Sequence, residues 1–439
     1  MTKDMPAPTN IPTQPVSRWW ALAAIECGHF VVYMDAFIVT LALPAMARQF
    51  GVGIHEIKWV VIAYLASLTV TLLLAGRLAD RWGRKRITII GVVVMTIGAA
   101  LCALAPTLSA LIGFRIVQGL GGSLVLANVM AEITAVFPRE ERRRAMAINA
   151  SVLAMGQITG LVLGGFLIGS VGWRFIFVLI AVIGAIGAIL DMVMLRNHVD
   201  ASGKTLDWKG AGLSILVVGV PFFLIERLSH HLLDPFGLAV LVAGLVLLGL
   251  FIAVERKVSW PLLDLNVFQS KAYTFGAAAS SFYFIVATFG YLLMPLYAQV
   301  VLRLSPLSAG LIIVPMSLAL TITSQLVGKW SNRLSARLVS TLGILCVTGA
   351  VFGMSLLDQH SSYALVMGLL ALAGVGGGLF HPPNNVAVLS GVPAKDLGAA
   401  NGFFTTARSF GQAIGAALAA TLLDQGLRSW GHPTFVRKP

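Results

Sequence analysis

Long apolar runs dominate this chain of 439 residues and restrict its fold more than any other feature. Thirteen runs recur along the sequence, most of them near the ~20 residues that a helix needs to cross the hydrocarbon core of a bilayer. Hydrophobic residues make up 57% of the composition and charged residues only 11%, which excludes a soluble domain of this size. The sequence therefore predicts an all-α polytopic membrane protein.

The spacing of the runs predicts two bundles and an insert. We expect a disordered cytoplasmic tail at residues 1–17, a six-helix bundle at 18–196, a linker with a two-helix insert at 197–271, a five-helix bundle at 272–423 and a tail at 424–439. The runs lie at 18–48, 58–75, 87–104, 109–136, 145–171, 173–195, 210–228, 237–255, 273–301, 306–330, 336–357, 363–390 and 397–423.

Positive charge is distributed unevenly between the two sides of the predicted membrane protein. With the amino terminus inside, 21 of the 31 lysines and arginines fall on the cytoplasmic side and eight on the outer side. This asymmetry predicts a cytoplasmic amino terminus in the plasma membrane of a bacterium. The net charge of +13 lies in short links rather than on a soluble basic face, so we expect no nucleic-acid partner.

Sites for catalysis, metals and nucleotides are not predicted. The three cysteines lie inside apolar runs without metal or disulfide spacing. Gly203, Lys204 and Thr205 are similar to the end of a phosphate-binding loop, but His198 stands where its first glycine belongs. We therefore expect no cofactor and no enzyme activity, and any transport must use an ion gradient.

A cationic link at residues 76–86 joins the second and third runs. One reading is a positive-inside loop only. Its order, Gly-x-Leu-Ala-Asp-Arg-x-Gly-Arg-Lys-Arg, also resembles the loop between helices 2 and 3 of the major facilitator superfamily. The residues expected to form this gating loop are Gly76, Asp80, Arg81, Gly83, Arg84, Lys85 and Arg86, with Glu132 as a partner.

Further segments resemble the drug:proton antiporter branch of this family, which has fourteen spanning helices. They lie at 35–44, 115–122, 207–210, 261–265, 382–385 and 400–408. The chain departs from that pattern at Phe37 and Thr40, at Leu161 after Gly160, and in the absence of a last helix. That absence predicts an outer carboxy terminus.

The resemblance implies a major facilitator fold and proton-driven efflux of amphipathic or cationic drugs by alternating access. The expected partners are a small-molecule substrate, protons and the lipid bilayer, and we expect a monomer. Two alternatives stay open: export of a specific metabolite, and a truncated relative that does not transport.

Ionisable groups inside the runs are candidates for proton coupling, because burying a charge in a membrane costs roughly 2.5–3.5 kcal/mol or more. Asp35 and Arg115 reach similar depths, so they form either an antiport site or a permanent ion pair. Glu26 lies about 180° around the same helix from Asp35. It is either a second proton site or a contact to a neighbouring helix. Glu132 and Asp191 lie near cytoplasmic ends, where they can reach the membrane surface.

The gating loop is expected to make two contacts. Asp80 is placed to accept from the helix that begins near Lys395, and Arg84 is placed to pair with Glu132. Gly156, Gly160, Gly164 and Gly165 form a stripe for close helix packing, within one bundle or between the two. The candidate residues for lining the substrate cavity are polar or aromatic: Gln118, Gln157, Tyr283, Tyr291, Asn385, Arg408 and Gln412.

Overall fold

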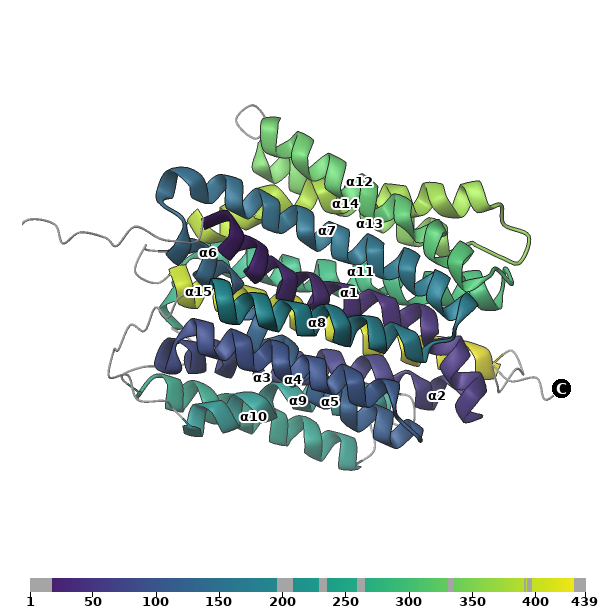
Figure 1. Cartoon of the computed structure of the whole chain (residues 1–439), viewed down its shortest axis with the longest axis horizontal. Helices are drawn as coiled ribbons and strands as arrows, with labels where there is room; N and C mark the ends of the chain where they lie inside the picture. The colour runs from purple at the N-terminus through teal and green to yellow at the C-terminus, as the bar shows by residue number, and fades with distance from the viewer. Residues whose placement is uncertain are drawn as a thin grey trace, which may run out of the picture.

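The computed structural model describes residues 18–195, 208–228, 235–258, 265–330, 335–390, 392 and 397–429. These residues form fifteen α-helices and one 3-10 helix and contain no strand, as the apolar runs predicted. The predicted tail at 1–17, and most of the linker before the insert, lie outside the described residues. In Figure 1 the long helices run side by side, and α1 begins at the opposite end of the molecule from the end of α15.

The first bundle holds the six predicted spans. They comprise α1 (Arg18–Phe50), α3 (Trp59–Trp82), α4 (Arg84–Ala103), α5 (Leu108–Leu126) with α6 (Val129–Val136), α7 (Arg139–Ser170) and α8 (Arg174–Met194), with the short α2 (Ile54–Ile57) after α1. Within it α1 packs on α7 and α8, and α4 packs on α5 and α8.

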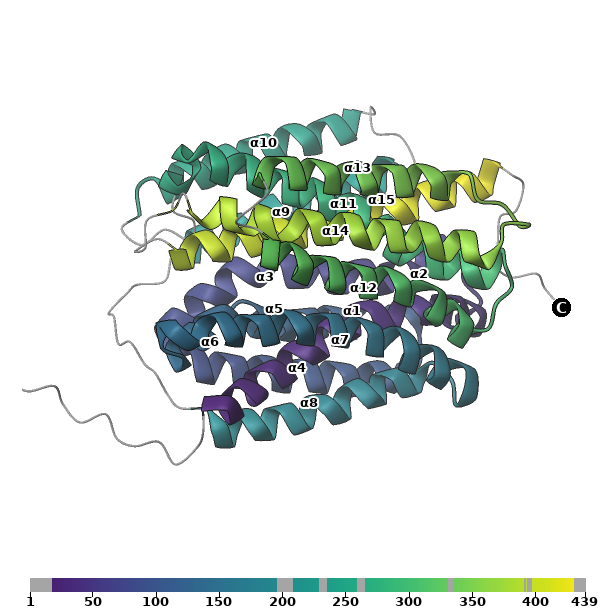
Figure 2. The same ribbon diagram turned by 90° about the horizontal axis from the view of Figure 1, so that it is seen from above.

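The insert and the second bundle follow. The insert is α9 (Trp208–Leu228) and α10 (Pro235–Glu255), and α9 packs against α3 and α15. After η1 (Leu265–Gln269) the second bundle comprises α11 (Lys271–Val300), α12 (Pro306–Trp330), α13 (Ala336–Ser355), α14 (Tyr363–Ser390) and α15 (Leu397–Ser429). Figure 2 shows the two bundles on opposite sides of the molecule.

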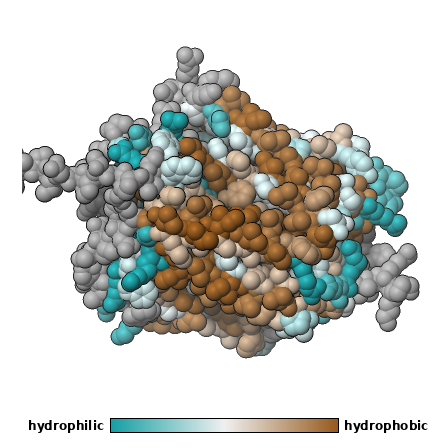
Figure 3. Space-filling view, in the orientation of Figure 1, coloured by the Kyte–Doolittle hydropathy of each residue, from teal (hydrophilic) through white to brown (hydrophobic). Residues whose placement is uncertain are grey.

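The surface fits a bilayer. In Figure 3 apolar side chains gather across the middle of the face and polar ones lie at its two ends. Eleven helices in the described part of the chain are long and apolar enough to cross a membrane. The two other predicted spans are α9, whose apolar stretch is shorter, and α15, which is helical but more polar.

Three predicted boundaries were wrong, and one of them is the start of α7, which begins at Arg139 rather than at residue 145. Residues 76–82 were assigned to a link, but α3 continues to Trp82, and only Gly83 separates it from α4. Gly83 has a φ of 92°, a left-handed conformation that costs glycine little, so one residue is enough to reverse the chain. At the other end of the chain, α15 continues to Ser429, beyond the predicted end of the last run at residue 423.

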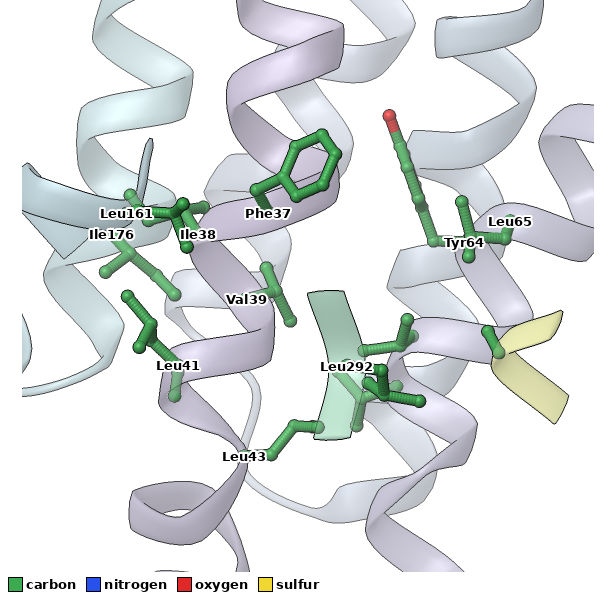
Figure 4. Close-up of a cluster of buried hydrophobic side chains, with 14 of the residues drawn as sticks. Phe37, Ile38, Val39, Leu41, Leu43, Tyr64, Leu65, Leu161, Ile176 and Leu292 are labelled. Atoms are coloured by element: carbon green, nitrogen blue, oxygen red, sulfur yellow. The ribbon is translucent and has the colours of Figure 1, made fainter. Parts of the chain in front are cut away.

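One large apolar cluster joins the two bundles near the predicted outer end. It includes Leu41 and Leu161 from the first bundle and Leu292 and Ile313 from the second. Figure 4 shows Leu292 of α11 lying among side chains of the first bundle. Burial of this shared cluster closes the boundary between the bundles at that end.

At the predicted cytoplasmic end the bundles have separate cores. One cluster contains Leu22 and Ile133 of the first bundle, and another contains Val388 and Phe404 of the second. A smaller cluster at this end brings Leu74 of α3 against the insert. The molecule is therefore packed together at the predicted outer end and less continuously packed at the other.

Candidate coupling and substrate site

Asp35 of α1 and Arg115 of α5 meet inside the first bundle, as their depths predicted. The Arg115 Nη1 atom donates to the Asp35 Oδ1 and Oδ2 atoms at 2.9 and 2.8 Å. It also donates to Gln118 Oε1 at 2.8 Å, while Nε donates to the Val60 carbonyl at 3.0 Å. The Tyr64 ring lies 4.1 Å from the guanidinium carbon. These contacts hold the pair in one geometry.

This ion pair is shielded from solvent. Asp35 is 0% exposed and Arg115 is 1% exposed. An unpaired charge at such a place would cost several kcal/mol, so each charge is stabilised by the other. Gln118, expected to line the substrate cavity, is instead bound into the pair. Protonation of Asp35 would remove the negative partner of Arg115.

Glu26 is held by a different set of residues. The Asn149 side-chain amide of α7 donates to its two carboxylate oxygens at 3.0 and 3.1 Å, and His29 Nδ1 lies 3.5 Å from Oε2. Asn149 and His29 did not stand out as candidates in the sequence. The signals were present: His29 lies one helical turn after Glu26, and Asn149 is an amide in an apolar run.

Arg408 of α15 lies at the boundary between the bundles. Its guanidinium carbon is 4.8 Å from the Phe284 ring and 5.8 Å from the Phe404 ring. Tyr33 of α1 is close enough to interact electrostatically with both Arg408 and Glu26. Tyr283, a predicted cavity residue, also lies near Arg408. The structure therefore brings Tyr283 and Arg408 together and adds Tyr33, which the sequence analysis did not select.

Two other predicted cavity residues meet across the same boundary. Gln157 of α7 lies beside Tyr291 of α11, which is also near Ser317 of α12. The Tyr291 ring packs edge-on against Phe37 with centroids 4.8 Å apart. Asn385 has a buried Oδ1 atom without a hydrogen-bond partner in the described residues. Gln412 makes no side-chain hydrogen bond to another described residue, so its predicted place in the site stays a prediction.

Two contacts were expected of the gating residues. Arg84 does not pair with Glu132 but contacts the neighbouring residue. Arg84 Nη1 donates to the Ala131 carbonyl at 3.3 Å, one residue before Glu132, and Glu132 Oε1 accepts from Thr88 at 2.8 Å. Asp80 pairs with Arg84, with 3.5 Å between Oδ1 and Nη2. Its expected contact near Lys395 falls outside the described residues.

The other members of the gating loop differ in their surroundings. The Lys85 ammonium donates to the carbonyls of Met192 and Leu195 at the end of α8. A Cβ on Gly76 would meet nothing within 4 Å, so no helix approaches closely there. Arg81 is exposed and Arg86 is exposed.

Two acids expected to reach the membrane surface are instead buried in the protein. Asp191 is 0% exposed and Glu132 is 6% exposed. They are buried because α1 packs against both α6 and α8 at this end of the bundle. Both Asp191 carboxylate oxygens lack a hydrogen-bond partner among the described residues.

The glycine stripe of α7 packs mostly within its own bundle. A Cβ on Gly156 or Gly160 would lie 3.0 Å from the Phe30 carbonyl oxygen or 2.8 Å from that of Met34, and one on Gly164 would meet Ile38, all on α1. A Cβ on Gly165 would lie 2.5 Å from the Pro306 carbonyl oxygen, at the start of α12. Gly165 is therefore the member of the stripe that brings the two bundles together.

Two bundles of membrane-spanning helices, with an ion pair buried in one of them, fit the class of polytopic membrane transporters. The family model of the Major Facilitator Superfamily matches residues 25–416. This chain belongs to the Major Facilitator Superfamily.

Relatives of known sequence agree with this assignment. The chain is 33% identical to "Multidrug resistance protein Stp" of Mycobacterium tuberculosis, over 95% of this chain and 78% of that protein. It is 30% identical to "Riboflavin transporter RibZ" of Clostridioides difficile, over 93% of this chain and 89% of that protein.

Solved structures show the same fold. A bacterial homologue of the human lysosomal transporter Spinster, in an inward-facing and occupied conformation, aligns with a TM-score of 0.65. The alignment covers 95% of this chain and 85% of that one at 15% identity. At this identity the likeness concerns the fold.

Proposed function

We propose that the protein exports amphipathic organic compounds in exchange for protons, by alternating access. The observation that carries this proposal is the fully buried pair of Asp35 and Arg115. A carboxylate in an apolar environment gains a proton readily, whereas a neighbouring cation favours its ionised form. Competition between these effects gives Asp35 a loaded and an unloaded state.

The packing of the bundles supports alternating access. The shared cluster and the approach of Gly165 to Pro306 hold the predicted outer end closed. Gln299 of α11 also donates to the Leu41 carbonyl at 3.0 Å across the boundary. Among the described residues, few hydrogen bonds would have to break for this end to open. We propose that the described conformation accepts substrate from the cytoplasm.

Drug export is favoured by the relative named for multidrug resistance, and a metabolite is the second candidate. The relative named as a riboflavin transporter favours that second candidate. Cationic drugs were part of the sequence prediction, but both carboxylates of α1 already have partners. The proposal therefore concerns amphipathic compounds, without a required positive charge.

Transport by purified protein in sealed vesicles tests the proposal. The vesicles would be loaded with substrate-like dyes and given a pH gradient, and dye movement and proton movement would be recorded together. The proposal predicts dye movement that depends on the gradient and stops when an uncoupler is added. Dye movement that is indifferent to the uncoupler contradicts it.

A further inference from the structure

The two arginines inside the helical bundles differ in their charge partners. Arg115 has Asp35 within 2.8 Å. Among the described residues no carboxylate lies within salt-bridge distance of Arg408, and its guanidinium makes no hydrogen bond. Its near neighbours are aromatic. Arg408 therefore has a positive charge that the described part of the protein does not neutralise.

The carboxylate of Glu26 does not neutralise Arg408, because it already has other partners. Glu26 and Arg408 both interact electrostatically with Tyr33, and the two Glu26 oxygens accept from Asn149. An uncompensated charge in a membrane-spanning helix costs several kcal/mol, so it is normally met by water or by a bound group of opposite charge. Arg408 is partly exposed as a whole residue.

Aromatic rings pack beside this charge, and among them Phe284 is partly exposed whereas Tyr283 and Phe380 are buried. Tyr283 and Phe380 are stacked with centroids 5.1 Å apart and planes inclined by 12°. The His381 ring lies 4.5 Å from Tyr283 and 5.3 Å from Phe284. The His381 Nδ1 atom is buried without a hydrogen-bond partner in the described residues, which is a second polar group left unused beside Arg408.

The site also includes the first bundle. Tyr33 of α1 is partly exposed and lies near Arg408. Its hydroxyl makes no hydrogen bond within the described part of the chain. A group bound at Arg408 would therefore be within reach of a donor from each bundle, and it would link substrate binding to the relative position of the bundles.

Resting on the transport function proposed above, we infer that Arg408 binds an acidic group of the substrate and that the preferred substrates are amphipathic organic anions with a planar apolar body. The guanidinium is suited to carboxylate and sulfonate groups because its donors form a planar fork. The planar body would pack on the partly exposed rings of Phe284 and Tyr33. A cationic drug would instead be repelled at this point.

Two xanthene dyes of similar shape and opposite charge test this inference. Fluorescein is the anionic probe and tetramethylrosamine the cationic one, and binding to the full chain in lipid nanodiscs is measured by fluorescence anisotropy. We expect fluorescein to bind more tightly to the unmodified protein. Arg408→Gln should weaken its binding about tenfold or more, the effect of losing one charge-assisted contact. The same change should leave tetramethylrosamine binding unchanged or stronger.

A matched control is available at the exposed Arg337 of α13. Arg337→Gln removes the same charge from the second bundle but should leave fluorescein binding unchanged. Arg408→Lys keeps the charge without the planar fork and should give an intermediate affinity. If Arg408→Gln does not fold, Tyr33→Phe and Arg408→Lys carry the test through smaller losses of fluorescein affinity.

The outcomes separate this inference from the transport function. Three results would overturn the anion site. Tetramethylrosamine could bind as tightly as fluorescein or more tightly, neither dye could bind, or the changes at 337 and 408 could have equal effects. Proton-coupled export of the cationic dye alone would overturn it while supporting export. Binding of fluorescein that no pH gradient moves would support the site and contradict the transport function.

Discussion

The Nη1 atom of Arg115 on α5 lies 2.9 and 2.8 Å from the two carboxylate oxygens of Asp35 on α1. This ion pair is the polar centre of the first bundle, and the Val60 carbonyl ties it to α3. Three helices therefore depend on one pair of charges. A change in the protonation of Asp35 alters the contacts of all three.

Removing the cation alone should destabilise the protein. Arg115→Gln leaves Asp35 buried without its partner, which we expect to cost about 3–5 kcal/mol of folding free energy. Combining it with Asp35→Asn should cost less than the sum of the two changes, because the single changes each leave an unpaired group. Thermal unfolding in detergent measures this, with Arg337→Gln as the control. Additive losses would show that the two groups are not coupled.

Closure of the predicted outer end depends on a small residue at position 165. Gly165→Ala places a methyl group 2.5 Å from the Pro306 carbonyl oxygen, so α7 and α12 must separate. We expect transport to fall in this variant. Gly169→Ala adds the same methyl group one turn later, where it meets nothing within 4 Å, and should transport normally. Equal rates for both variants would contradict a role for this contact.

Asp80 should affect transport more than stability. It is partly exposed and pairs with Arg84 at 3.5 Å, and such pairs contribute roughly 0–1 kcal/mol. Asp80→Asn should therefore leave the unfolding temperature nearly unchanged and dye binding intact, while lowering the transport rate. Transport at the normal rate would show that this residue is not part of a gate.

The orientation of the chain is open to a labelling test. We expect Gln359, on the link between α13 and α14, to face outward, and Arg81, at the end of α3, to face the cytoplasm. Each is changed to cysteine in a chain whose Cys27, Cys102 and Cys346 are replaced by serine. A membrane-impermeant maleimide should label position 359 in intact cells and position 81 only after permeabilisation. The reverse pattern would invert the topology.

The sequence was sufficient for the fold and for the contact between Asp35 and Arg115. Apolar runs and charged links determine the spans, because a membrane requires both. Asp35 and Arg115 were found because charges in apolar runs are rare and the two share a depth. The face that each helix presents to its neighbours could not be predicted from the sequence. Hydropathy does not tell protein-facing from lipid-facing positions when lipid and protein are equally apolar.

Particular residues show this limit. Gln118 and Gln157 look alike in sequence, yet one binds Arg115 and the other lies beside Tyr291 across the bundle boundary. Asn149 could not be assigned to Glu26, because the rotation of α7 against α1 follows from packing of the glycine stripe. The link at residues 76–86 is shorter than its polar residues predict, because α3 continues through them to Trp82.

The most direct test of proton coupling at Asp35 is transport by Asp35→Asn in sealed vesicles. This change removes the titrating group with little change in side-chain volume. We predict that export driven by a pH gradient disappears, whereas exchange of labelled for unlabelled substrate, which needs no net proton movement, continues. If the variant still exports substrate against a gradient and an uncoupler still stops it, Asp35 does not carry the proton and the account is contradicted.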